Sequence, residues 1–303
     1  SIRESVMTEA TEKGVCRPPH EFSTDTGLRR FCFKLRRNKA AVAGGVMLLV
    51  YLSAALLAPL LVQGDAAAPN LSMALETPSP QEPLGTDELG RSILGRIIYG
   101  ARVSLLIAVG VVAVGLFIGV PLGLVSGYFG GKIDFGIQRA TDAMLAFPGF
   151  LLALAFVSVL GAGIKNTMIS IGISMVPQYI RLVRACVLTV RAEVYVEAAR
   201  AAGTRDGMIL WRHILPNVMV PITVQTSLSM GTAILFAAGL GFLGIGVQPP
   251  TPEWGTMLGS ARNYLFHAPH VATFPGLAIF LAVLSFNLLG DVLRDALDPR
   301  FKV

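Results

Sequence analysis

Long apolar runs alternate with polar segments along this chain. Each run comes close to the roughly 20 residues that an α-helix needs to cross a hydrocarbon core of about 30 Å. Backbone amides in lipid must be bonded within their own segment, so these continuous runs favour helices over barrel strands, which alternate apolar and polar residues. The pattern predicts an all-α, polytopic membrane protein with six transmembrane helices, at residues 40–62, 103–126, 143–162, 167–187, 218–243 and 271–290.

The first run, from Ala40 to Val62, could be taken for a signal peptide, because a basic segment precedes it and three alanines, Ala66 to Ala68, follow it. The apolar core of a signal peptide takes about 7 to 15 residues, and this run is longer. We therefore expect it to remain in the protein as a membrane helix.

The composition also indicates a protein that resides in lipid. Hydrophobic residues make up 53% of the 303 residues and charged residues only 15%, and the mean hydropathy is +0.63. These values lie far from those of water-soluble domains. The net charge of +6 does not indicate nucleic acid, because no stretch interleaves Lys or Arg with stacking aromatic residues. We expect a lipid bilayer as the environment and no nucleic-acid partner.

The distribution of Lys and Arg predicts the orientation of the helices. If the N-terminus is cytoplasmic, 20 of the 25 Lys and Arg residues fall in inside segments. Cytoplasmic segments carry the excess of Lys and Arg in membrane proteins, so both termini are predicted to be inside. The five that fall outside are Arg91, Arg96, Arg102, Lys165 and Arg262.

This topology divides the chain into four parts. Residues 1–38 are a cytoplasmic segment, and 39–102 hold the first membrane helix and a periplasmic segment. Residues 103–295 form a five-helix domain whose cytoplasmic loop is 187–217, and 296–303 are a cytoplasmic tail. We expect a multi-pass membrane protein.

Two outside segments, 63–102 and 244–270, are large enough to contact a soluble partner, although both could also serve only to cap the bundle. The second contains candidate docking residues, Glu253, Trp254 and Arg262, which offer an aromatic anchor with flanking charges. Alternatively, Trp254 lies at the bilayer surface, where tryptophan is enriched.

Four glycines in the second predicted helix recur at four-residue spacing: Gly115, Gly119, Gly123 and Gly127. They share one face, where another helix can approach closely, so we expect a packing role. The alternative is that this face lines a pore.

The spans hold little that could drive transport or chemistry. Spans 1, 2 and 5 contain no Asp, Glu, Lys, Arg or His. Ion-coupled carriers place polar sites near the midplane, and an intramembrane enzyme would need a nucleophile and a base there. A secondary carrier and a membrane-embedded enzyme remain the alternative classes, but we expect the energy source to lie outside this chain. The charged groups elsewhere fall near predicted inner ends: Arg139, Asp142, Arg181, Arg184 and Asp291.

The cytoplasmic loop 187–217 is predicted to form a helix, a turn and a second helix. Alanines around 198–202 favour a helix, Gly203 can take the left-handed conformation that ends it, and Thr204 with Asp206 can cap the next one. Pro216 marks the start of the fifth span. A short helix with alanine on its surface can enter a groove on another protein, and Glu197 and Arg205 could set its register.

The loop resembles the E-A-A loop of permease subunits in bacterial ABC importers. The matching positions, which this resemblance identifies as contacts to the ATPase, are Glu197, Ala198, Ala199, Gly203, Arg205, Asp206, Ile214, Leu215 and Pro216. The resemblance extends over residues 30–303 and points to the second, C-type permease of the dipeptide, oligopeptide, glutathione and nickel importers. It is carried by segments 85–91, 100–105, 212–216, 249–255 and 287–299.

This resemblance implies one helix followed by a five-helix permease core, located in the inner membrane of a bacterium and forming a passive half of a translocation pathway. The implied partners are a homologous second permease, two cytoplasmic ATPases and a periplasmic binding protein that delivers a di- or oligopeptide. Glutathione and nickel chelates are the alternative cargoes. No cofactor is expected on this chain, because ATP and Mg²⁺ would be held by the ATPase subunits.

The cysteines and histidines do not indicate a metal site. Cys16, Cys32 and Cys186 have no C-x-x-C spacing and are expected to be reduced thiols. His267 and His270 lie three residues apart without a nearby Cys or carboxylate, which is a weak basis for a metal site.

The chain is not expected to be an enzyme or to bind a nucleotide. A G-x-G-x-x-G motif at Gly239, Gly241 and Gly244 follows no predicted strand, and the sequence contains no Walker-type phosphate loop. ATP hydrolysis is therefore expected on partner subunits.

Overall fold

The computed structural model describes residues 39–62 and 65–297, with side chains as far as residue 295. Within these ranges the chain forms helices and no strand, apart from an isolated bridge between Thr86 and Ser92. The all-α prediction is confirmed. The predicted N-terminal segment and C-terminal tail, together with Cys16 and Cys32, lie outside the described residues.

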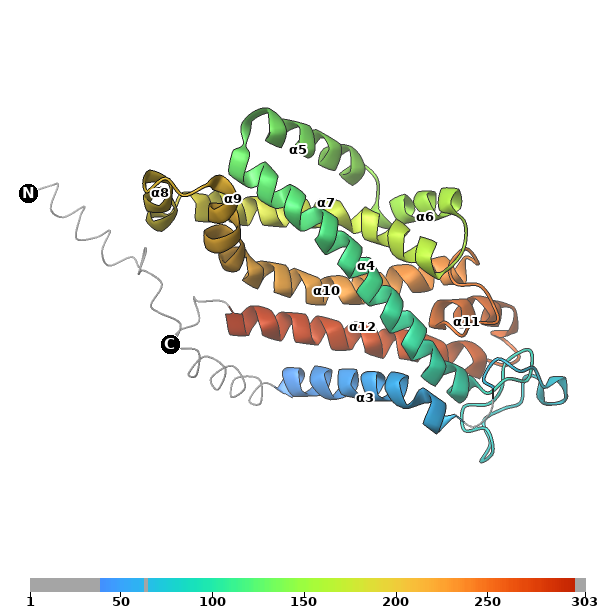
Figure 1. Cartoon of the computed structure of the whole chain (residues 1–303). Coiled ribbons are helices and arrows are strands. Elements are labelled where there is room, and N and C mark those ends of the chain that lie inside the picture. Colours follow the sequence, from blue (N-terminus) through green and yellow to red (C-terminus); the bar gives the residue numbers. More distant parts are fainter. Residues whose placement is uncertain (1–38, 63–64, 298–303) are drawn as a thin grey trace, which may run out of the picture. The chain divides into compact units, whose positions relative to one another are not determined.

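The described helices follow one another in the order shown in Figure 1. They are α3 (Lys39–Leu61), η1 (Leu71–Met73), α4 (Ile93–Phe129), α5 (Gly131–Leu145), α6 (Gly149–Leu160), α7 (Ile164–Arg191), α8 (Val194–Ala201), α9 (Asp206–Ile209), the π-turn η2 (Leu210–Ile214), α10 (Leu215–Phe242), α11 (Trp254–Ala261), η3 (Arg262–Tyr264) and α12 (His270–Leu297).

Five helices are long and apolar enough to cross a membrane: α3, α4, α7, α10 extended back to Asp206, and α12. The amphipathic stretch before the second predicted span is part of α4, which begins at Ile93. These five helices match five of the six predicted spans.

The third predicted span, 143–162, is not a single helix. The chain bends by 90° between α5 and α6, and α6 has only 12 residues. Proline disfavours the α conformation of the residue before it, so Pro148 ends the helix near Phe147 and starts a new one. A sixth span exists only if α5 and α6 are taken together as one bent element.

The long helices pack around α4. Figure 1 shows α3, α12 and α10 side by side, with α4 crossing them diagonally, and α7 packs along α4. Helices α8 and α9 lie at one end of the bundle, which we call the loop end. Residues 65–92 and α11 lie at the other end, which we call the cap end.

Large apolar side chains are exposed on the outer surfaces of the long helices, as contact with lipid requires. Leu56 and Leu60 of α3 are 78% and 80% exposed, and Phe117 of α4 is 85% exposed. A helix that is apolar on all sides suits lipid contact and would be unfavourable in water. Side chains of α4, α7, α10, α11 and α12 fill the main core, and a second buried cluster lies at the loop end.

Candidate functional site

The predicted helix, turn and helix are present at the loop end. Helix α8 ends where Gly203 takes a left-handed φ of +77° and donates its N–H to Arg200 O at 3.0 Å. The next N–H, of Thr204, bonds to Ala199 O at 3.1 Å. These bonds satisfy carbonyls that the end of a helix would otherwise leave free.

The predicted cap of the second helix is wrong. Arg205 occupies the N-cap position of α9, and no side chain caps that helix. The carboxylate of Asp206 instead accepts a hydrogen bond from the Tyr128 hydroxyl, with 2.5 Å between the oxygens. A partner 78 residues away along the chain has replaced the local cap.

The loop is anchored by three fully buried side chains. Val196 of α8, Ile209 of α9 and Ile214 of the π-turn are each 0% exposed. They pack in the loop-end cluster with residues of α4, α7 and α10. Ile214 is therefore an anchor of the loop and not a surface that a partner can touch.

Most of the other residues singled out by the E-A-A pattern face outward. Leu215 and Ala199 are partly buried, whereas the exposed set is Glu197, Ala198, Gly203, Arg205, Asp206 and Pro216. Pro216 lies in the first turn of α10, as predicted. The exposed residues of the pattern are thus its polar and small ones, together with Pro216.

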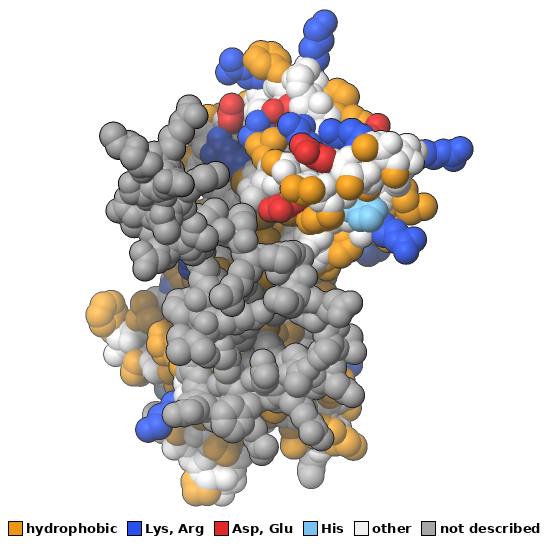
Figure 2. All heavy atoms as spheres, turned by 90° about the vertical axis from the view of Figure 1, so that its left-hand side faces the viewer, with side chains coloured by type: hydrophobic (Ala, Val, Ile, Leu, Met, Phe, Trp, Pro, Cys, Tyr) orange, Lys and Arg blue, Asp and Glu red, His pale blue; other side chains and the backbone are white. Residues whose placement is uncertain are grey.

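Exposed apolar residues lie among them, and sequence reasoning missed them. Val194 is 79% exposed, Met208 52% and Trp211 73%. Figure 2 shows the loop end, where hydrophobic side chains are interspersed with acidic and basic ones. Large apolar residues in a polar loop were the available signal, because such residues exposed to water often mark an interaction site.

Arginines of α7 fasten the neighbouring helix ends. Arg184 makes two bonds of 2.6 Å to the carboxylate of Asp134 in α5, and Arg191 donates to the carbonyls of Gly127 and Tyr128 at 3.2 and 2.8 Å. Bidentate pairs of this kind fix orientation as well as distance. They hold α5 and the end of α4 against α7.

The four glycines of α4 face α7 at close range. A β-carbon at Gly115 would lie 2.9 Å from a ring carbon of Tyr179, and one at Gly119 would lie 2.5 Å from Cβ of the same tyrosine. At Gly123 and Gly127 the same atom would lie 2.7 Å from the Cβ atoms of valines in α7. The stripe therefore lies in a helix contact and not along an open channel.

The docking residues predicted at the cap end need correction. Trp254 is 0% exposed and Glu253 1% exposed, so neither presents a surface to a partner or to the bilayer interface. The indole N–H of Trp254 donates to Ile97 O at 3.0 Å, and its ring contacts Tyr51 edge-on at 5.4 Å between centroids. An aromatic side chain in a proline-rich loop can be a core residue once the loop folds back onto α4.

Glu253 caps α11 from its buried position. Its carboxylate accepts from the N–H groups of Gly255 and Thr256 at 2.9 and 2.8 Å, and from the hydroxyl of Ser104 at 3.3 Å. Burial raises the pKa of this carboxyl, and the hydrogen bonds oppose that shift in part. Arg262, by contrast, is exposed, next to Leu265 at 47% and Phe266 at 97% exposure.

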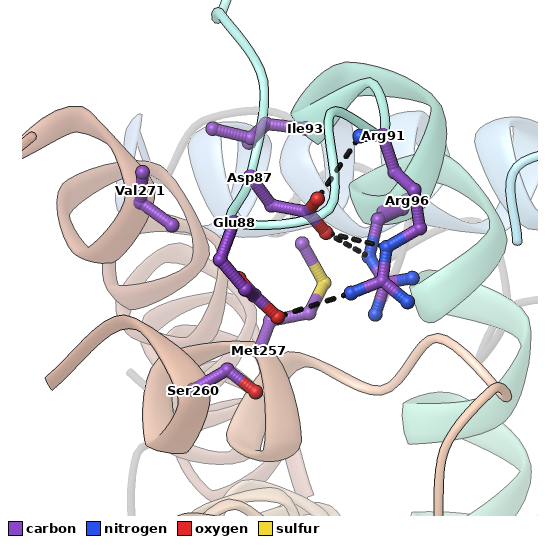
Figure 3. Close-up of a pocket in the computed structure, with 8 residues that line it drawn as sticks. All are labelled: Asp87, Glu88, Arg91, Ile93, Arg96, Met257, Ser260 and Val271. Atoms are coloured by element: carbon purple, nitrogen blue, oxygen red, sulfur yellow. Dashed lines mark hydrogen bonds and ion pairs between the residues drawn. The ribbon is translucent and has the colours of Figure 1, made fainter. Parts of the chain in front are cut away.

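A buried charged cluster fastens the cap to α4. Figure 3 shows two arginines on the same side of Asp87: Arg91 Nε lies 2.7 Å from its Oδ2, and Arg96 Nε lies 3.3 Å from the same atom. Glu88 accepts a further bond from Arg91 at 3.2 Å. From the sequence these arginines were predicted only to be topology signals, and their pairing with Asp87 and Glu88 was not predicted.

Among the described residues no cluster of three or more His, Cys, Asp or Glu side chains could hold a metal ion. Cys186 is a free thiol. Gly239 and Gly241 of the G-x-G-x-x-G motif lie within α10, where they pack against Phe150 and Glu253.

Comparison with known proteins identifies the family. The family described as "Binding-protein-dependent transport system inner membrane component" matches residues 119–303, which is more than half of the chain. The chain belongs to this family. The N-terminal membrane domain of oligopeptide transport permease C matches residues 27–78, so the chain is a C-type ABC importer permease and a multi-pass inner-membrane protein.

Relatives of this permease cover nearly its whole length. The dipeptide transport permease DppC of Alkalihalophilus pseudofirmus is 47% identical over 94% of both chains. The glutathione transport permease GsiD of Pectobacterium atrosepticum is 46% identical over 92% of this chain and 93% of its own. The di/tripeptide permease DppC of Pseudomonas aeruginosa is 47% identical over 91% and 93%.

Solved structures confirm the permease fold. Two inward-facing crystal forms of the MetNI methionine ABC transporter match with TM-scores of 0.53 and 0.56, at 16% and 15% identity. The matches cover 67% and 68% of this permease and 97% and 98% of the MetNI chains. At this identity the likeness bears on the fold alone.

Proposed function

We propose that this permease forms half of the translocation pathway of an ABC importer that takes up di- or oligopeptides. The cargo is inferred from the relatives, which carry dipeptide, di/tripeptide and glutathione names at 46–47% identity. Glutathione is the second candidate for the same reason, and nickel chelates are a third. Uptake of a dipeptide, a tripeptide, glutathione and a nickel chelate by the reconstituted complex separates them.

The loop end is proposed to face the cytoplasm and to dock an ATPase. The observation that carries this proposal is the outward surface around Glu197, Ala198 and Gly203, with Val194 and Trp211 exposed beside it. Small and apolar side chains with charged neighbours suit insertion into a groove on a soluble subunit. ATP and Mg²⁺ would then be held by two ATPase subunits, and this chain would be non-catalytic.

Transport in this proposal is a shift between inward- and outward-open states. ATP bound between the two ATPases would draw their docking grooves together and move α8 and α9 of each permease. Shifting an equilibrium from 1:99 to 99:1 takes about 5.5 kcal/mol of differential binding, and this energy would come from ATP. A homologous second permease would supply the other half of the pathway.

The cap end is proposed to receive a periplasmic binding protein. Arg262 remains a candidate contact, and the exposed Leu265 and Phe266 join it in place of the buried Trp254. An exposed aromatic residue beside a cation is the kind of group that carries interface energy.

The coupling role is tested by Gly203→Leu and Glu197→Lys in the reconstituted complex. Both residues are exposed, and nothing lies within 4 Å of a β-carbon at Gly203, so membrane insertion should survive. We expect uptake and binding-protein-stimulated ATP hydrolysis to fall together. Gly131→Leu is the matched control and should leave both unchanged, because Gly131 is also exposed, also has a left-handed φ, +58°, and also has nothing within 4 Å of its β-carbon. Retention of stimulated hydrolysis in both loop variants would contradict the coupling role.

A further inference from the structure

Tyr128 joins the last turn of α4 to both short helices of the loop end. It is 5% exposed, and its hydroxyl donates to Asp206 of α9 at 2.5 Å. The guanidinium of Arg200 in α8 lies over the Tyr128 ring, 5.5 Å from its centroid. One side chain therefore contacts α8 and α9 together.

Helix α8 has few other attachments to the bundle, whereas α9 continues through the π-turn into α10 as one 37-residue element, Asp206–Phe242. Helix α8 buries only Val196, and α9 buries only Ile209. A helix of eight residues is not stable on its own, so the position of α8 depends on tertiary contacts. Apolar packing holds α8 and α9 against the bundle without fixing their orientation. A hydrogen bond to a carboxylate is directional and is stronger than a hydrogen bond between neutral groups.

Helix α4 carries this contact to the opposite end of the bundle. It has 37 residues, which at about 1.5 Å per residue is about 55 Å of helix. Near its other end, Ile97 accepts the indole N–H of Trp254, and the Asp87 and Arg96 pair ties the cap segment to the same helix. A displacement of Tyr128 would thus be passed along a continuous helix to α11.

We propose that Tyr128, through its bond to Asp206, is the positioning residue that transmits movement of α8 and α9 to α4. The inference rests on the proposed function, in which an ATPase moves these two helices. Arg191 supports the link, because its bonds to the carbonyls of Gly127 and Tyr128 hold the end of α4 in place. Loss of the link would leave ATP hydrolysis running without an equal movement of α4.

The test is the number of peptides taken up per ATP hydrolysed by the complete complex in proteoliposomes. Tyr128→Phe keeps the ring and removes the hydroxyl, and we expect the ratio to fall about ten- to a hundredfold, as for loss of a hydrogen bond to a charged group. Asp206→Ala should lower it equally. The double variant should be no worse than either single variant, because both remove the same bond.

Two controls separate this link from a merely structural role. Asp206→Asn keeps an oxygen that can accept the bond but removes the charge, so it should lower the ratio less than Asp206→Ala does. Tyr99→Phe, towards the other end of α4, removes a hydroxyl that has no partner among the described residues, and should change nothing. If Tyr128→Phe destabilises the complex, Asp206→Ala provides the measurement from an exposed position.

An unchanged ratio in both Tyr128→Phe and Asp206→Ala would overturn the link. Additive losses in the double variant would overturn it as well, because the two residues would then act separately. A wild-type complex that transports no peptide with ATP would instead refute the proposed function, so the two failures are distinguishable.

Discussion

The indole N–H of Trp254 in α11 donates to the carbonyl of Ile97 in α4 at 3.0 Å, across 157 residues of sequence. A β-carbon at Gly100, one turn further along α4, would lie 2.9 Å from the same indole ring. The glycine thus makes room for the tryptophan, and the loop between α10 and α12 becomes part of the core.

The two tryptophans of the chain should behave in opposite ways. Trp254→Ala leaves a large cavity and removes the hydrogen bond to Ile97, so we expect a loss of about 3–5 kcal/mol in the free energy of unfolding. Trp211 is 73% exposed, and Trp211→Ala should change stability little while weakening ATPase association. Thermal unfolding in detergent and co-purification of the ATPases measure the two effects. Equal thermal stability of both variants would contradict the buried role of Trp254.

Alanine at Gly119 should weaken the contact between α4 and α7. Its β-carbon would lie 2.5 Å from Cβ of Tyr179 and 3.1 Å from a backbone oxygen of α7, so the helices must separate. Overpacking of this kind costs about 1–3 kcal/mol. Gly45→Ala on α3, where nothing lies within 4 Å, is the matched control and should be neutral or slightly stabilising. A Gly119→Ala protein as stable as the Gly45→Ala protein would rule out close packing at the stripe.

The orientation of the helices is open to a direct test. A reporter fused after Val303 should be active only as a cytoplasmic fusion, and one inserted near Thr251 only outside, as the Lys and Arg distribution predicts. The insertion site lies between α10 and α11, at the cap end. The reverse pattern would place the loop end outside and would remove the basis for ATPase docking.

Glu253 should make stability depend on pH in a defined direction. Its folded-state pKa is raised by burial, so the folded protein binds more protons than the unfolded chain between the two pKa values. The stabilisation is complete below the unfolded value, about 4.3, and is lost as the pH rises through the folded value. Thermal unfolding should show this loss in the wild type and not in Glu253→Gln. Glu76→Gln, an exposed position at the same end, should keep the wild-type dependence. If the Glu253→Gln protein has the same pH profile as the wild type, then Glu253 is not the responsible group.

Fold class and membrane character were readable from the sequence because lipid imposes a length and a composition on every span. The bend at Pro148 was not predicted, because hydropathy does not register a local break in a helix. The residues on both sides of the proline are apolar, so the predicted span continues through it. The proline ring disfavours the α conformation of Phe147, and this breaks the helix.

At the candidate site, the sequence by itself determined the turn at Gly203 and the short helix before it, because left-handed φ and alanine propensity are local properties. Only the tertiary structure decided that Asp206 pairs with Tyr128 and that Trp254 is buried. These partners lie 78 and 157 residues apart along the chain. Local pattern shows that a residue is charged or aromatic, but whether it faces a partner protein or the core depends on which distant helix packs over it.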